Sequence, residues 1–120
     1  MSRIRNIKPD FWISEQVIKC SPTARLLFIG LWNFADDHGV HPNSFLKIKA
    51  QIFPADPFSL DEIKDMLQEL IDNDLIIEYD VDGKEYLMII TWRKHQKIEK
   101  PTYKYPLPNG YSDDTFWKED

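Results

Sequence analysis

The sequence has few of the residues on which catalytic and redox motifs are built. Its four glycines are not clustered, so it contains no phosphate-binding loop and no dinucleotide-binding fingerprint. A single cysteine, Cys20, excludes an internal disulfide, and nothing near it in the sequence would lower its pKa, so we interpret it as a small core residue. No apolar run is long enough to cross a bilayer, and no secretory leader is evident. We therefore expect a cytoplasmic protein without enzymatic activity, cofactor, small-molecule substrate or membrane partner.

The chain also lacks net positive charge, which taken alone argues against a nucleic-acid partner. Its formal charge is −5 over 120 residues, but the charge is unevenly distributed. The balance is +3 for residues 1–55, −9 for 56–90, +4 for 91–111 and −3 for 112–120. Because local charge decides what docks where, we expect contacts with a polyanion only at the two basic segments.

Apolar periodicity and capping residues predict an α-rich domain with a single core, since 42% of the residues are hydrophobic. Ser21-Pro22 indicates a helix start, Ser59 and Glu62 form a capping-box pattern, and Asp82-Gly83 is a strong hairpin-turn signal. The predicted helices are Phe11–Lys19, Ser21–Ala35, Ser44–Phe53 and Ser59–Asn73, and the predicted strands are Val40–Asn43, Leu75–Tyr79 and Glu85–Trp92.

This order of elements predicts a mainly α fold with a small β-hairpin, arranged as a winged helix-turn-helix. We assign residues 1–95 to the winged-helix domain. Residues 96–120 are basic and then acidic, and we expect a carboxy-terminal tail or linker that is ordered only if it packs back on the domain.

Several parts of the sequence resemble a known family. The stretch from Arg3 through Phe11-Trp12, then Ser21–Asp37 with Gly39, and the closing Thr91-Trp92 with His95-Gln96, is similar to small phage and prophage replication proteins. It more distantly resembles the amino-terminal winged helix of DnaD-type replisome organisers, and the resemblance as a whole covers roughly residues 3–105. The resemblance implies a DNA-associated winged helix that often self-associates and helps to load replication machinery. The expected partners are thus DNA, replication proteins and a second copy in a homodimer. Such proteins usually continue into a further domain, whereas this sequence stops at Asp120.

The helix in the recognition position is acidic, which disfavours the usual use of the fold. Between residues 59 and 73 it carries five acidic residues against Lys64 alone. Asp61, Asp65 and Glu69 follow one another at four-residue spacing and are predicted to line one exposed ridge. Phosphate contacts come from cations, so this ridge would repel DNA. We interpret it either as a solvated face or as a protein-interaction site for a basic partner or a second copy.

The basic segments are the better candidates for DNA contact. We expect the amino-terminal segment to act as a flexible arm that follows the phosphate backbone or lies in a minor groove, and Lys84 to lie at the hairpin tip. In residues 93–104 the cations interleave with aromatic rings, a mixture that suits single strands, although the segment could equally be a solvated linker whose tyrosines pack on the domain. The predicted nucleic-acid-binding residues are Arg3, Arg5, Lys8, Lys47, Lys84, Arg93, Lys94, Lys97, Lys100 and Lys104.

A loop with several potential metal ligands follows the second predicted helix. Asp36, Asp37, His38 and His41 lack defined ligand spacing, and Asp and Gly residues belong at a helix stop. We therefore interpret this loop as a turn and predict no metal site.

Together these observations predict a non-enzymatic, DNA-binding winged-helix protein of phage or prophage replication, either a replisome organiser or a loader accessory. It would bind single- or double-stranded DNA weakly or without sequence specificity. The alternatives are a protein-interaction or dimerisation module that uses the acidic helix 59–73, and a winged-helix transcriptional regulator.

Overall fold

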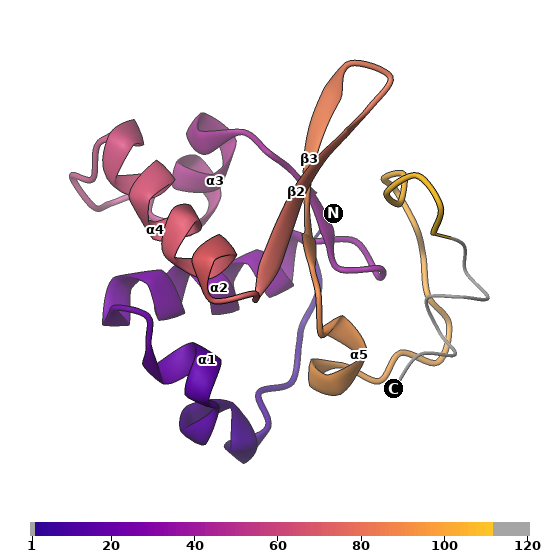
Figure 1. The fold of residues 1–120 in the computed structure, drawn as a ribbon, viewed down its shortest axis with the longest axis horizontal. Helices are drawn as coiled ribbons and strands as arrows, with labels where there is room; N and C mark the ends of the chain where they lie inside the picture. The colour runs from indigo at the N-terminus through magenta and orange to yellow at the C-terminus, as the bar shows by residue number, and fades with distance from the viewer. Residues whose placement is uncertain (1, 112–120) are drawn as a thin grey trace.

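The protein combines a group of helices with a three-stranded antiparallel sheet, and the computed structural model describes residues 2–111 (Figure 1). In chain order the elements are the 3-10 helix η1 (Pro9–Ile13), α1 (Glu15–Ile18), α2 (Pro22–Phe34), β1 (Val40–Pro42), α3 (Phe45–Ile52), α4 (Leu60–Asp72), β2 (Ile76–Val81), β3 (Lys84–Ile89) and α5 (Trp92–His95). The fold is thus mixed α/β, and the predicted small hairpin understates the sheet because β1 adds a third strand.

Local capping explains where the main helices begin. The Ser21 hydroxyl accepts a hydrogen bond from the Ala24 N–H at the start of α2. At the start of α4, Ser59 and Glu62 each accept from the other's backbone N–H, so the predicted capping box is confirmed. These bonds satisfy N–H groups that have no partner within the helix.

The core lies between the helices and one face of the sheet. Helix α2 supplies its centre and packs against both α3 and α4. Residues of α2 that are buried are Ala24, Leu27, Phe28, Leu31 and Trp32. Leu26 of the same helix is exposed, so α2 is buried on fewer sides than its apolar sequence predicts.

The sheet has the strand order β1-β3-β2, and β2 and β3 form the predicted hairpin. Asp82 and Gly83 at its turn have φ angles of 53° and 79°, which are typical of a type I′ turn. The predicted extension of the last strand to Trp92 is wrong, because β3 ends at Ile89 and Trp92 begins α5. The Trp92 side chain turns into the core, where its indole N–H donates to the Asp37 carbonyl at 2.9 Å.

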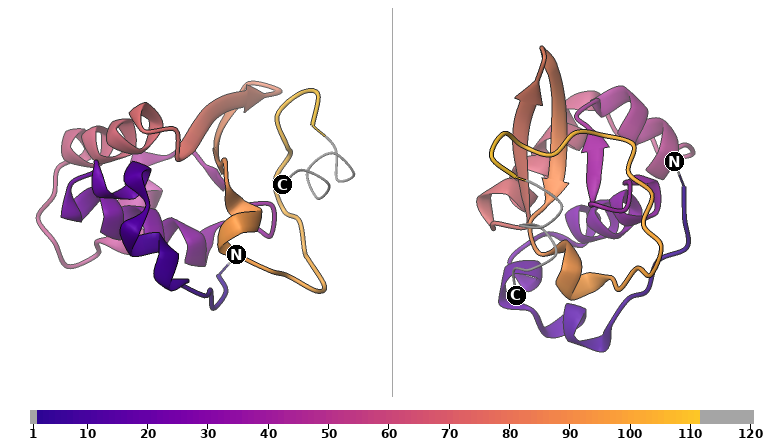
Figure 2. Two further views of the ribbon diagram at one scale, coloured as in Figure 1. Left: turned by 60° about the horizontal axis from the view of Figure 1, so that its bottom comes forward. Right: turned by 90° about the vertical axis from the view of Figure 1, so that its right-hand side faces the viewer.

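Residues 96–111, called the carboxy-terminal strap here, pack back on the domain. They run along the side of the sheet that faces away from α3 and α4 (Figure 2). Tyr79 of β2 donates its hydroxyl hydrogen bond to the Pro106 carbonyl at 2.7 Å, and the Tyr86 and Tyr105 rings lie 6.0 Å apart. Contacts between the strap and the domain therefore extend to Leu107, and Pro108 is buried. The acidic end of the predicted tail, residues 112–120, lies outside the described residues.

Among residues 2–111, no helix is both long and apolar enough to span a membrane.

Candidate nucleic-acid interface

Two fully buried carboxylates, Asp36 and Asp37, organise the surface on which the basic segments lie. Asp36 accepts hydrogen bonds from the backbone N–H groups of His38 and Val40 through Oδ1, at 3.0 and 3.1 Å. Its Oδ2 accepts from two backbone N–H groups of the strap, at 2.9 and 3.1 Å. The loop that we considered for metal ligands is therefore a turn whose Asp36 side chain binds backbone donors on both of its oxygens. In residues 2–111 no cluster of three or more His, Cys, Asp or Glu side chains could hold a metal ion.

Asp37 holds the amino-terminal segment in place through two arginines. Arg5 is paired with Asp37 Oδ1 at 2.9 Å, and its side chain is only 3% exposed. The same guanidinium donates to the backbone carbonyls of Trp32 and Ala35 and lies 4.8 Å from the centre of the Trp92 ring. Arg5 is thus part of the fold and has little surface left for phosphate.

Arg3 binds the other oxygen of Asp37, but its side chain remains 41% exposed. The Arg3 backbone exchanges two hydrogen bonds with Asn33 of α2, one of them with the Asn33 side chain. The amino-terminal segment is therefore docked along the domain, and the flexible arm that we expected is not observed.

The two basic segments lie side by side because Gln96 joins them. The Gln96 side chain accepts from the Asn6 N–H at 3.1 Å and donates to the Asn6 carbonyl at 2.7 Å. Gln96 is buried, so both halves of its amide group are committed to this bridge. Neither residue was among the predicted site residues, since an uncharged Gln or Asn carries no signal for a partner 90 positions away.

A groove of about 500 Å³ lies between these segments, next to the Asn6–Gln96 bridge. Its walls are residues 3–6 on one side and residues 96–100 on the other. Arg3, Lys97 and Lys100 give it positive charge, and Glu99 is the acidic residue among those that line it. Backbone and polar side chains make up most of the remaining wall, which suits an anionic chain better than an apolar ligand.

Two further predicted cations extend this surface past the bridge. Lys8 follows Asn6 by two residues, and Lys94 precedes Gln96 by two. Burial, followed by the nearby charges of Lys8 and Lys94, lowers the pKa of His95 to about 4. His95 is therefore neutral near pH 7, and the two lysines lie within electrostatic range of its ring. We call Arg3, Lys8, Lys94, Lys97 and Lys100 the basic surface.

The remaining predicted cations lie apart from the groove lining. Lys47 is on α3 and Lys84 is at the hairpin, where it lines a second hollow of about 410 Å³ together with Tyr105 and residues 42–44. The Lys104 ammonium lies 5.6 Å from the centre of the Tyr105 ring, and Arg93 of α5 is half-buried. Of the predicted nucleic-acid-binding residues, the structure thus brings together only those of the two basic segments that lie around the groove.

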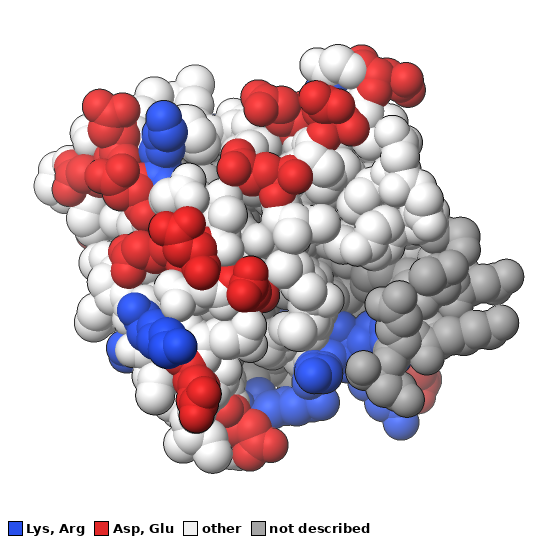
Figure 3. All heavy atoms as spheres, viewed as in Figure 1, with Lys and Arg blue, Asp and Glu red and all other residues white. Residues whose placement is uncertain are grey.

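The acidic residues of α4 and the hairpin occupy another part of the surface. Figure 3 shows acidic side chains over α4 and the β2–β3 hairpin and a group of basic side chains near α5, with other basic side chains over α4 and near α1. Asp61 and Asp65 are exposed, as predicted. Glu69 is not part of a free ridge, because its carboxylate accepts from the Ser21 N–H at 2.7 Å and from the Ser21 hydroxyl at 2.8 Å. It caps α2 instead.

Comparisons with protein-family models, with curated proteins and with solved structures found no match to this chain. The assignment of a function therefore rests on the residues and the geometry described above.

Proposed function

We propose that the protein is a non-enzymatic DNA-binding protein with a winged-helix fold that acts in phage or prophage replication. The observation that carries the proposal is the meeting of both basic segments on one face, across the Asn6–Gln96 bridge. Cations placed together on a surface bind the phosphate backbone without reading base sequence. The replication context comes from the resemblance of residues 3–105 to phage and prophage replication proteins.

The order of elements supports the winged-helix part of the proposal. Helices α2, α3 and α4 are followed by the β2–β3 hairpin, and β1 joins that hairpin as the third strand, next to β3. In such folds the third helix of this set enters the major groove. Here that helix, α4, carries Asp61, Asp65 and other acids, so the basic surface takes over contact with DNA.

Binding is tested by fluorescence anisotropy of labelled DNA across a salt series. We expect the affinity to fall as the salt concentration rises. The double variant Lys97→Glu/Lys100→Glu should reduce the slope of log K against log salt concentration by roughly 1.4–1.8, which corresponds to the loss of about two phosphate contacts. The matched control is Lys19→Glu/Lys64→Glu, which changes the net charge equally at exposed positions outside the basic surface. Absence of binding at low salt, or an equal loss in the control, would contradict the proposal.

A second candidate function is a protein-interaction module that uses the acidic face. The exposed carboxylates of Asp61 and Asp65, next to the acidic hairpin, favour it. A basic partner, or the basic surface of a second copy, would complement this face. The solution mass of the protein, and of its Asp61→Lys/Asp65→Lys variant, distinguishes the two: a dimer that the variant abolishes favours the interaction module.

A further inference from the structure

We propose that the groove between residues 3–6 and 96–100 takes single-stranded DNA in preference to duplex, with phosphates on Arg3, Lys97 and Lys100 and a base against Tyr103. This inference rests on the proposed DNA binding and specifies which form of DNA the basic surface accepts. It follows from the shape and charge of two different faces and from the position of one aromatic ring.

Part of the basic surface, at Arg3, Lys97 and Lys100, is hollowed into a groove. Duplex DNA is read by an element that projects into its major groove, which is about 12 Å wide and admits a helix or a two-stranded ribbon. The corresponding elements here, α4 and the β2–β3 hairpin, carry the acidic face (Figure 3). A hollow of about 500 Å³ bounded by two chain segments has instead the size of a small-molecule pocket, which admits a short length of strand but not a duplex.

Both walls of the groove contribute positive charge. Lys97 and Lys100 are exposed and lie on one wall, while Arg3 reaches the groove from the other. Because Asp37 fixes the Arg3 guanidinium, one cation of the groove is already oriented before DNA arrives. A positively charged groove that follows the backbone is one of the two parts of a non-specific single-strand site.

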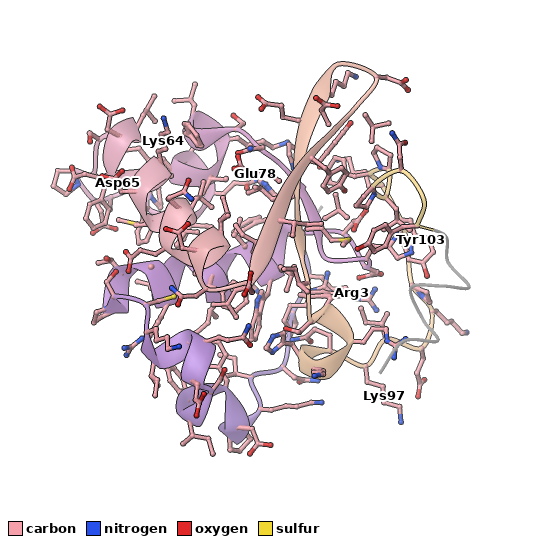
Figure 4. The ribbon with its side chains drawn as sticks, in the orientation of Figure 1. Arg3, Lys64, Asp65, Glu78, Lys97 and Tyr103 are labelled. Carbon is pink, nitrogen blue, oxygen red and sulfur yellow. The ribbon has the colours of Figure 1, made fainter. Side chains whose placement is uncertain are left out.

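An aromatic residue of the strap supplies the second part. The Thr102 N–H and Arg3 bind the same oxygen of Asp37, and Tyr103 is the next residue of the strap after Thr102. The Tyr103 ring is stacked on His38, with ring centres 3.6 Å apart and planes within 7°, and it is 36% exposed. Figure 4 shows the labelled Arg3, Lys97 and Tyr103 on the strap side of the molecule, away from Lys64 and Asp65. The exposed part of a ring that stacking holds in place is suited to contact a base.

The groove rim adds apolar surface. Ile4 is 93% exposed although it lies between the two arginines that bind Asp37. An exposed apolar side chain next to cations is disfavoured in water and is suited to the face of an unstacked base. A duplex keeps its bases stacked inside and would leave Ile4 without this contact.

The experiment compares labelled oligo(dT) with a duplex of the same length, by anisotropy at one low salt concentration. We expect the single strand to bind at least about tenfold more tightly. Tyr103→Ala should weaken oligo(dT) binding about fivefold or more, as loss of one base–aromatic stack does, whereas Tyr103→Phe should keep the affinity. Duplex binding should be the same for all three proteins. Circular dichroism and the unfolding midpoint establish whether the Tyr103→Ala variant is folded. If that variant is unfolded, Tyr103→Leu is used in its place.

The outcomes separate this inference from the proposed function. Equal or tighter binding of duplex, still lost in Lys97→Glu/Lys100→Glu, would overturn the single-strand preference and leave DNA binding standing. A Tyr103→Ala protein that loses nothing, or loses single-strand and duplex binding alike, would overturn the stacking role. Failure to bind either probe would overturn both proposals.

Discussion

Removing the charge of Asp37 tests whether the buried carboxylates hold the amino-terminal segment and the strap together. The Asp37→Asn side chain keeps nearly the same shape but leaves the Arg5 guanidinium, 3% exposed, without its anionic partner. Breaking a buried ion pair from one side costs about 3–5 kcal/mol, against a total stability of roughly 6–18 kcal/mol for a chain of this length. We therefore expect a folded protein whose free energy of unfolding is lower by about 4 kcal/mol.

Urea denaturation at pH 7, followed by tryptophan fluorescence, measures this loss. With an m value of about 2 kcal/mol/M, a loss of 4 kcal/mol lowers the midpoint by about 2 M at unchanged m. The control Asp65→Asn removes an exposed carboxylate and should change stability by less than about 0.5 kcal/mol. Adding Arg5→Met to Asp37→Asn should recover part of the loss, since no unpaired charge then stays buried. A loss below about 1 kcal/mol for Asp37→Asn, or strict additivity in the double variant, would refute this account of the ion pair.

Three further predictions concern single positions. Gly39→Ala should lower the free energy of unfolding by about 2–4 kcal/mol, measured by thermal unfolding, because φ is +79° and the new Cβ would lie 2.8 Å from the Trp92 ring. The control Gly83→Ala has the same φ but open space around the new Cβ, so it should lower the free energy of unfolding by only about 1–2 kcal/mol. Since burial lowers the pKa of His95 to about 4, the unfolded chain takes up its proton first as the pH falls. The free energy of unfolding should therefore decline between about pH 6.5 and 4, by an amount on the order of 2 kcal/mol after allowance for the partial exposure of His95. Urea titrations at each pH measure this decline, and the His95→Gln variant should show a smaller one. Glu69→Ala should lower the unfolding free energy by about 1–2 kcal/mol through loss of the cap on α2, and an unchanged urea midpoint would contradict that role.

The parts of the fold that were predictable depend on short-range chemistry. Ser59 and Glu62 satisfy each other within one helical turn, and Asp82-Gly83 supplies the positive φ angles of its own turn. Both interactions involve residues only a few positions apart, so a short stretch of sequence contains everything that is needed to predict them.

The end of β3 and the strap were not predictable in this way. Trp92 has strand propensity, but its position is decided by the carbonyl of Asp37, 55 residues earlier. The strap is held by Asp36, whose partners at residues 104 and 105 are 68 and 69 positions away. A buried carboxylate and an exposed one look alike in a sequence, so two consecutive aspartates at a helix stop suggested only a turn.

The same limit applies to the basic residues, and it bears on how the groove works. Arg3, Arg5, Lys97 and Lys100 count equally in a charge balance, yet Arg5 is committed to Asp37 and to backbone carbonyls while both lysines face the groove. Arg3 does both, because one part of its guanidinium binds Asp37 and the side chain is still 41% exposed. Since Asp37 also binds the strap through the Thr102 N–H, a single carboxylate links both walls of the groove to the core. The two lysines can therefore vary in charge at little cost to the fold, whereas a change at Asp37 alters the stability of the protein and the shape of its basic surface together.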